Sequence, residues 1–195
     1  MINQNFVYLG VLCSLLGSTS YIIDTIRGKT KPNRVTWLII AIAPLIGFVA
    51  QLKQGVGIQA LMTFIVGFNP LMIFLASFVN KKAYWKITAL DIWCGVLALL
   101  GIVLWQFTKD PNTAILFAIL ADLLGIIPTV VQSYKFPETE NWKVFLGGLF
   151  NSSITLLTIK IWDFAHYAFP IYIWFSCAVL FVLIRFGRGV DVSGS

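Results

Sequence analysis

The sequence RGKTKPNRVTW, residues 27–37, is a basic stretch between two long apolar runs, and a fainter copy, QSYKFPETENW, occupies residues 132–142. Pro32 and Pro137 lie 105 residues apart (137 − 32), and Trp37 and Trp142 share the same offset. A repeat on this scale in so apolar a chain predicts a membrane protein built from two similar halves. That architecture is common among transporters.

The composition places the chain in a bilayer. Of its 195 residues, 58% are hydrophobic and 11% are charged, whereas an ordinary soluble domain carries about a quarter charged residues. A soluble helical protein with so few charges could not cover its own core. Several apolar runs also reach the roughly 20 residues that a bilayer demands.

Apolar length and helix breakers predict an all-α integral membrane protein with seven transmembrane helices. Polar loops at residues 80–82 and 108–112 separate helices, and a short break at 53–57 implies a tight hairpin. The expected helices cover residues 5–26, 35–52, 57–79, 84–107, 112–134, 142–161 and 166–186.

The loops also predict the orientation, because Lys and Arg collect on the cytoplasmic side. With the N-terminus outside and the C-terminus cytoplasmic, eleven of the fourteen basic residues fall inside and three fall outside. The net charge of +6 is then a topology signal rather than a sign of nucleic-acid binding. We expect a prokaryotic inner membrane, and a disordered tail at 187–195 that derives in part from an expression vector.

The repeat divides the chain into two triple-helix units, residues 1–79 and 111–186, joined by a linker helix within residues 80–110. A single linker helix gives both units the same orientation, so the arrangement is three helices, one and three, with parallel repeats. No HExxH, GxSxG, P-loop or CxxC pattern occurs, and we therefore expect no enzyme, no cofactor and no metal site.

This plan resembles the PQ-loop superfamily, which includes SWEET and SemiSWEET sugar transporters, cystinosin-like exporters, PnuC vitamin transporters and the KDEL receptor. The resemblance rests on residues 125–135, GIIPTVVQSYK, followed by Glu140-Asn141-Trp142. The family pattern has a Pro-Gln pair near the helix end. Here Thr129 follows Pro128, and Ile23 stands at the matching position of the first half.

Polar side chains at membrane depth usually face a cavity or a partner, and Asp122, midway along the fifth helix, is the strongest candidate. It would accept a substrate hydrogen bond or couple transport to protons, or else it is satisfied by a neighbouring helix. Asn69, beside Pro70 on the third helix, matches a pocket asparagine of SWEET-like proteins or stabilises the proline kink. Asp91 on the fourth helix is either a structural partner of a basic residue or directly functional.

Two further candidates are Asn151 and Trp174. Asn151, midway along the sixth helix, binds substrate or holds helices together. Trp174 lies 105 residues after Asn69, so it would stack on a ring-shaped substrate or pack in the core. Trp37 and Trp142, at expected helix ends, are first interpreted as interfacial anchors.

Prolines inside helices remove a hydrogen bond and create hinges. Pro44, Pro70 and Pro128 lie within the second, third and fifth helices, and the resemblance to SWEET-like transporters implies that Pro44 and Pro128 act in closing a gate.

The expected function is transport of a small polar metabolite, such as a sugar, amino acid or vitamin, through a facilitator or a proton-coupled carrier. The expected partners are the substrate and the lipid bilayer. The alternative on the same fold is a non-transporting receptor or scaffold that uses the basic loop 27–34 to contact a protein or anionic lipid.

Overall fold

The computed structural model describes residues 2–79, 86–108 and 110–187, with side chains except at 101, 102, 104–106 and 108. Of the expected tail at 187–195, residues 188–195 lie outside the described residues. Those that are described form seven α-helices and one 3-10 helix, with no β-strand among them. The elements are α1 (Phe6–Ile26), α2 (Arg34–Lys53), α3 (Ala60–Ala76), α4 (Ala89–Thr108), α5 (Pro111–Lys135), η1 (Pro137–Thr139), α6 (Trp142–Thr158) and α7 (Phe164–Phe186).

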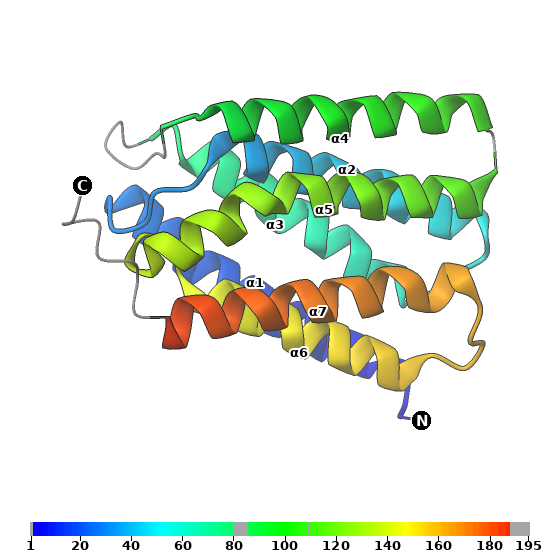
Figure 1. The fold of residues 1–195 in the computed structure, drawn as a ribbon. Helices are drawn as coiled ribbons and strands as arrows, with labels where there is room; N and C mark the ends of the chain where they lie inside the picture. Colours follow the sequence, from blue (N-terminus) through cyan, green and yellow to red (C-terminus); the bar gives the residue numbers. More distant parts are fainter. Residues whose placement is uncertain (1, 80–85, 109, 188–195) are drawn as a thin grey trace.

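The seven helices lie side by side and reverse direction from one to the next (Figure 1). The start of α1 and the end of α7 therefore lie at opposite ends of the molecule. We call the end that holds the α1–α2 loop and η1 the basic end. The basic residues there include Arg27, Lys29, Lys31, Lys135 and Arg185.

Within the described residues, four helices are long and apolar enough to cross a membrane, namely α1, α2, α5 and α7. Shorter apolar helices are α3 and the part of α4 from Ala89 to Leu100. Large apolar side chains point outward from several helices; Trp93 on α4, for example, is 67% exposed. An apolar outer surface of this kind fits lipid, and the chain has the character of an integral membrane protein.

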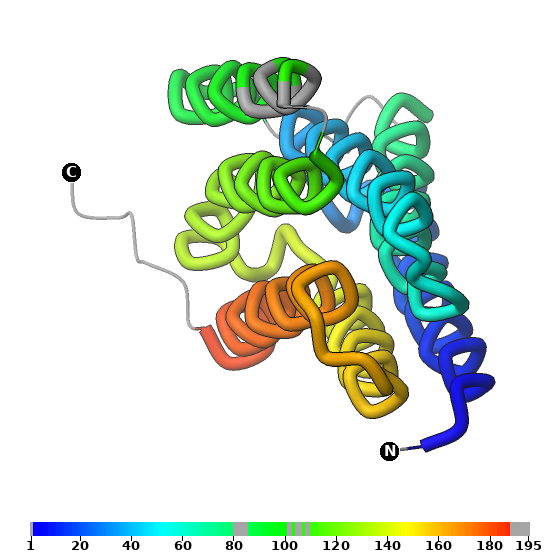
Figure 2. The backbone as a smooth tube through the Cα atoms, turned by 90° about the vertical axis from the view of Figure 1, so that its right-hand side faces the viewer, coloured from blue at the N-terminus to red at the C-terminus, as the bar shows by residue number. Residues whose placement is uncertain are grey.

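Six helices form a ring in the order α1, α3, α2, α5, α7 and α6, with each helix packed on the next. The view along the helices shows α4 outside this ring, against α5 and α2 (Figure 2). In each half of the chain the third helix therefore lies between the other two. The pairs α1–α6 and α2–α5 join the halves.

The third and sixth helices are shorter than expected. The third begins at Ala60 rather than 57, because the preceding residues turn at Gly55, which has a φ of +77°. It ends at Ala76, where the Arg34 side chain donates to the Ser77 carbonyl oxygen at 2.7 Å. The sixth ends at Thr158, after which Ile159 is extended.

Asp91 fastens the outer helix α4 to the ring. Its Oδ1 accepts a hydrogen bond from Asn33 Nδ2 at 2.7 Å, and its Oδ2 accepts from the Thr88 hydroxyl at 2.9 Å. Asn33 in turn caps α2 by accepting from the amides of Val35 and Thr36. Asp91 is buried in this network and lies outside the central cavity described below, so its contacts are structural.

We expect Asp91→Ala to lower the free energy of unfolding by about 1–3 kcal/mol, because it leaves the buried Asn33 amide without its acceptor. Thermal unfolding in detergent measures this loss. Glu138→Ala is the control, since Glu138 is also acidic but is exposed. If the two variants lost the same stability, the role of the Asp91–Asn33 contact would be wrong.

The two copies of the basic stretch are not in the register that the shared Trp and Pro spacing suggested. Asn33 caps α2 and Asn141 caps α6, so the helix starts are 108 residues apart rather than 105. Trp142 is the first residue of α6, whereas Trp37 lies one turn inside α2. Trp37 is only 2% exposed, so the interpretation of Trp37 as an interfacial anchor is wrong.

Candidate functional site

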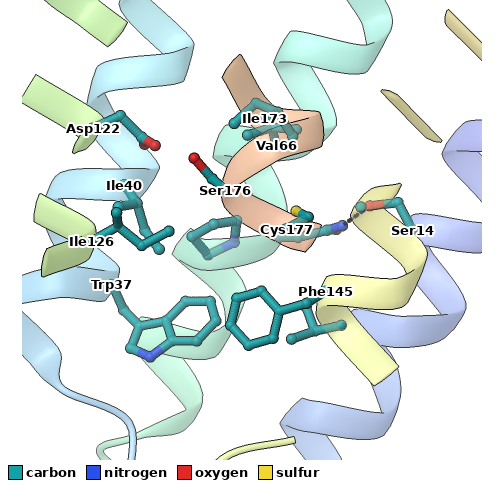
Figure 3. A pocket seen from close by; sticks show the side chains of 14 residues that line it. Ser14, Trp37, Ile40, Val66, Asp122, Ile126, Phe145, Ile173, Ser176 and Cys177 are labelled. Atoms are coloured by element: carbon teal, nitrogen blue, oxygen red, sulfur yellow. Dashed lines mark hydrogen bonds between the residues drawn. The ribbon is translucent and has the colours of Figure 1, made fainter. Parts of the chain in front are cut away.

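A partly open cavity of about 70 Å³ lies at the centre of the ring of helices. Every ring helix contributes to its wall, and none of the described side chains of α4 does (Figure 3). The lining residues are Ser14 of α1, Trp37 and Ile40 of α2, Val66, Asn69 and Pro70 of α3, Asp122 and Ile126 of α5, Val144, Phe145 and Gly148 of α6, and Ile173, Ser176 and Cys177 of α7.

The wall of this cavity repeats between the two halves of the chain. On α3 the lining positions are 66, 69 and 70, and on α7 they are 173, 176 and 177, a constant offset of 107. Trp37 and Ile40 of α2 correspond to Phe145 and Gly148 of α6 at an offset of 108. Ser14 of α1 corresponds to Asp122 of α5 at the same offset, so equivalent helices present equivalent positions to the cavity.

Asp122 is 1% exposed, and its carboxyl group is held from one side only. The Tyr172 hydroxyl of α7 donates to Oδ2 at 2.6 Å. Oδ1 is buried and has no hydrogen-bond partner in the described part of the chain. Figure 3 shows the carboxyl group and the Ser176 hydroxyl pointing toward each other beside the cavity.

Asn69 lines the same cavity from the opposite half. Its Nδ2 donates to the Ser14 hydroxyl at 2.9 Å, so the two polar lining residues of the first half bind each other. The structure thus brings Asn69 and Asp122 to one cavity, although 53 positions separate them in the sequence (122 − 69).

Asn151 and Trp174 do not line this cavity. Asn151 is fully buried against Gly10 of α1, and its amide atoms have no partner among the described residues. Trp174 is 37% exposed and donates from its indole nitrogen to the Ser153 hydroxyl at 3.0 Å. The offset of 107 between the lining positions of α3 and α7 explains why Trp174 lies outside the cavity. At this offset Asn69 corresponds to Ser176 rather than to Trp174.

The three prolines interpreted as hinges are buried inside their helices, Pro44 in α2, Pro70 in α3 and Pro128 in α5. Pro70 also lines the cavity. A fourth proline, Pro170, also lies buried inside α7 and is not among the predicted hinges. It is the seventh residue of α7, beyond the first turn in which Pro is tolerated, so it removes a backbone hydrogen bond of the helix as the other three prolines do.

Hydrophobic clusters lie on both sides of the cavity. Toward the basic end, Tyr21, Trp37 and Phe145 pack with Ile73 and Leu180. Toward the other end, small and apolar residues around Phe169 and Met62 pack together. At that second end, Gln51 Nε2 of α2 donates to the Ala165 carbonyl oxygen of α7 at 3.0 Å.

A polar cluster covers the basic end beyond the aromatic residues. The Tyr21 hydroxyl donates to Glu140 Oε2 at 2.6 Å, while the ring of Tyr21 lies 4.8 Å from that of Trp37. Asn141 Nδ2 donates to Asp24 Oδ2 at 2.6 Å. Both contacts join α1 of the first half to the segment that begins α6 of the second half. We call Tyr21, Asp24, Glu140 and Asn141 the end cluster.

Glu140 is the unusual member of the end cluster. Burial raises the pKa of its carboxyl to about 8, although the hydrogen bond from Tyr21 works against that rise. Its Oε1 has no partner among the described residues. At neutral pH the folded protein therefore keeps a proton here that an exposed glutamate would release.

The two copies of the basic stretch also meet at this end. The Lys31 amide donates to the Thr139 carbonyl oxygen at 2.9 Å. Gln132 Nε2 donates to the Lys31 carbonyl oxygen at 3.1 Å and to the Thr139 hydroxyl at 3.0 Å. The loop that follows α1 is thus bound to the end of α5 and to η1.

Sequence reasoning missed Ser14, Tyr172 and the Tyr21–Glu140 pair. Ser14 and Tyr21 lie on α1 among apolar residues. A serine or a tyrosine in such a run does not by itself predict that its side chain is buried or lines a cavity. In the sequence, Glu140 stands out only as part of the Glu140-Asn141-Trp142 motif. Its partner lies 119 residues away, and no local pattern marks such a contact.

A scan against protein-family models, a search of curated proteins and a search of solved structures each found no match for this chain.

Proposed function

We propose that this protein is a membrane transporter, a facilitator or proton-coupled carrier of a small metabolite that works by alternating access. Two parallel three-helix bundles, α1–α3 and α5–α7, would move against each other, with α4 as the linker. The proposal retains the resemblance to the PQ-loop superfamily. It also keeps the basic end on the cytoplasmic side of a prokaryotic inner membrane, as the distribution of Lys and Arg favours.

The repeated wall of the central cavity carries this proposal. Positions on α3 and α7, and on α2 and α6, line the cavity at one nearly constant offset. A substrate site at the interface of two structural repeats, near the middle of the helices, is the arrangement typical of secondary transporters. A receptor needs a site open to one side only, and has no need of a cavity shared equally by two halves.

The surroundings of the cavity support two alternating gates. The hydrophobic cluster around Trp37 and Phe145 lies on one side, and the cluster around Phe169 lies on the other. Helix-interior prolines in four of the six ring helices lack a backbone hydrogen bond, and these are places where such helices bend. Opening one cluster at a time would expose Asn69 and Asp122 to one side at a time.

Cys177 offers a test that needs no knowledge of the substrate. It lines the cavity, whereas Cys13 and Cys94 do not. In a Cys13→Ala, Cys94→Ala background, we expect a membrane-impermeant methanethiosulfonate to label Cys177 both in right-side-out cells and in inside-out vesicles. Cys177→Ala in the same background is the control for residual labelling.

Labelling from one side alone would contradict alternating access and would favour the receptor alternative on the same fold. Complete protection from both sides would contradict the transport proposal as well. Addition of a transported solute should slow labelling from both sides, because a bound solute occupies the cavity beside Cys177.

A further inference from the structure

The polar groups of the central cavity are unevenly satisfied. In the first half Asn69 and Ser14 bind each other. At the equivalent place in the second half, Asp122 has Tyr172 on one oxygen and no partner, in the described chain, on the other. Two buried polar atoms of lining residues thus lack a partner among the described residues, the Asp122 Oδ1 acceptor and the Trp37 Nε1 donor, and only Asp122 belongs to a group that can carry charge.

This carboxyl group has no basic side chain near it in the cavity. The described lining holds neither Lys, Arg nor His, and Asp122 is its one acidic residue. The titratable side chains that face it from α7 are Tyr172 and Cys177, and neither supplies a positive charge. A carboxylate buried without a cation is strongly unfavourable, so an ionised Asp122 needs a positive partner from outside the chain.

The rest of the wall is apolar and partly aromatic. Trp37 and Phe145 lie side by side at the part of the cavity nearer the basic end (Figure 3). Asp122 lies farther along the helices, beside Ile173 and Val66. A sugar in this space would leave most of its hydroxyl groups without partners, and each unpaired buried hydroxyl weakens binding by roughly 1–3 kcal/mol.

We propose that the ligand of this cavity is a small organic amine with an apolar, ring-sized body. Its ammonium group donates to the free oxygen of Asp122 and replaces the missing positive charge. Its body lies against Trp37 and Phe145, whose rings pack on apolar groups. This inference rests on the proposed function, since it narrows the substrate of the same site.

A series of three probes that differ only in the head group tests the charge. Phenethylamine carries an ammonium group at pH 7, 2-phenylethanol a hydroxyl group and phenylacetate a carboxylate. We expect millimolar phenethylamine to raise the thermal midpoint of the full chain in detergent, because a ligand of the folded state stabilises it by mass action. The alcohol should bind at least tenfold more weakly, and the carboxylate should give no shift.

Asp122→Asn should abolish the shift with phenethylamine, because it removes the charge and keeps the volume. Asp110→Asn is the matched control, since Asp110 is exposed, lies outside the cavity and keeps its helix cap as asparagine. If the Asp122 variant fails to fold, the comparison of the three head groups on the unaltered chain still tests the charge of the ligand.

Equal shifts with the amine and the alcohol would overturn the inference, and so would the lack of any shift with the amine at saturation. Uptake of another solute by proteoliposomes, without amine binding, would overturn the substrate class and leave the transport proposal intact. Amine binding that depends on Asp122, with Cys177 labelled from one side only, would support the ligand class and contradict transport.

Discussion

Gly17→Ala is expected to lower the free energy of unfolding by about 1–3 kcal/mol, because it forces apart the two helices that join the halves of the chain. A methyl group on Gly17 would lie 2.5 Å from the Lys143 carbonyl oxygen of α6. On the other side of the contact, a methyl group on Gly147 would lie 2.7 Å from the Cys13 carbonyl oxygen of α1. Both obstacles are backbone atoms, which cannot turn away as a side chain can.

Thermal unfolding in detergent measures the effect, and the midpoint should fall by roughly 2–12 °C for a chain of this size. Gly57→Ala is the control, because the added methyl group would lie 3.7 Å from the nearest atom, Gln59 Oε1. Gly125→Ala should have an intermediate effect, since the obstacle there is the side chain of Ile39. If the Gly17 and Gly57 variants unfolded at the same temperature, the close α1–α6 contact would be wrong.

The two contacts between the halves therefore differ in kind. Helices α1 and α6 meet backbone against backbone, as small residues permit in membranes. Helices α2 and α5 meet through side chains such as Ile39, and both contain an internal proline. In an alternating-access cycle α1–α6 is suited to act as the fixed contact, and α2–α5 as the contact that slides.

The helical plan could be predicted because apolar length and loop polarity are local properties. The second helix, expected at 35–52, is Arg34–Lys53, and the fifth, expected at 112–134, is Pro111–Lys135. The register between the halves could not be predicted, because Trp37 and Trp142 suggested a spacing that the helix caps do not follow. Asn33 and Asn141 cap their helices through side-chain bonds, and a cap is decided by that geometry rather than by tryptophan spacing.

The same error of register explains why Trp174 does not line the cavity, but not why Asn151 does not, since Asn151 is polar at mid-helix as Asp122 and Asn69 are. Asp122 and Asn69 are polar at mid-helix, and burial at that depth requires a cavity or a partner whatever the register. Trp174 depended on the offset of 105, and it lies away from the cavity. Tyr172, which holds Asp122, could not be distinguished by sequence from the other tyrosines, because its role depends on the packing of α7 on α5.

Glu140→Gln is expected to remove a large part of the pH dependence of stability between pH 5 and pH 8. Burial raises the folded-state pKa of Glu140 to about 8, well above the ordinary value of 4.5. Between these two values the folded state holds a proton that the unfolded state has released. The free energy of unfolding therefore falls as pH rises through this interval and levels off above about pH 8.

The difference between wild type and variant follows from the same argument. At pH 5 both side chains are neutral in the folded state, and a glutamine oxygen still accepts from the Tyr21 hydroxyl, so the variant should have nearly wild-type stability. At pH 8 the variant should be more stable by several kcal/mol at most, since each pKa unit corresponds to about 1.4 kcal/mol. Thermal midpoints in detergent at pH 5, 6, 7 and 8 would measure this divergence.

Glu138→Gln is the matched control, because Glu138 is two residues away on the same turn and its side chain is exposed. Its curve should stay parallel to that of the wild type. Parallel curves for Glu140→Gln as well would show that Glu140 is ionised in the folded state, contrary to its burial against Tyr21. A Glu140→Gln curve that diverges from the wild-type curve would mean that protonation of Glu140 stabilises the folded protein. The hydrogen bond from Tyr21 of α1 to Glu140, which holds the basic end closed, is then most stable when this carboxyl carries its proton.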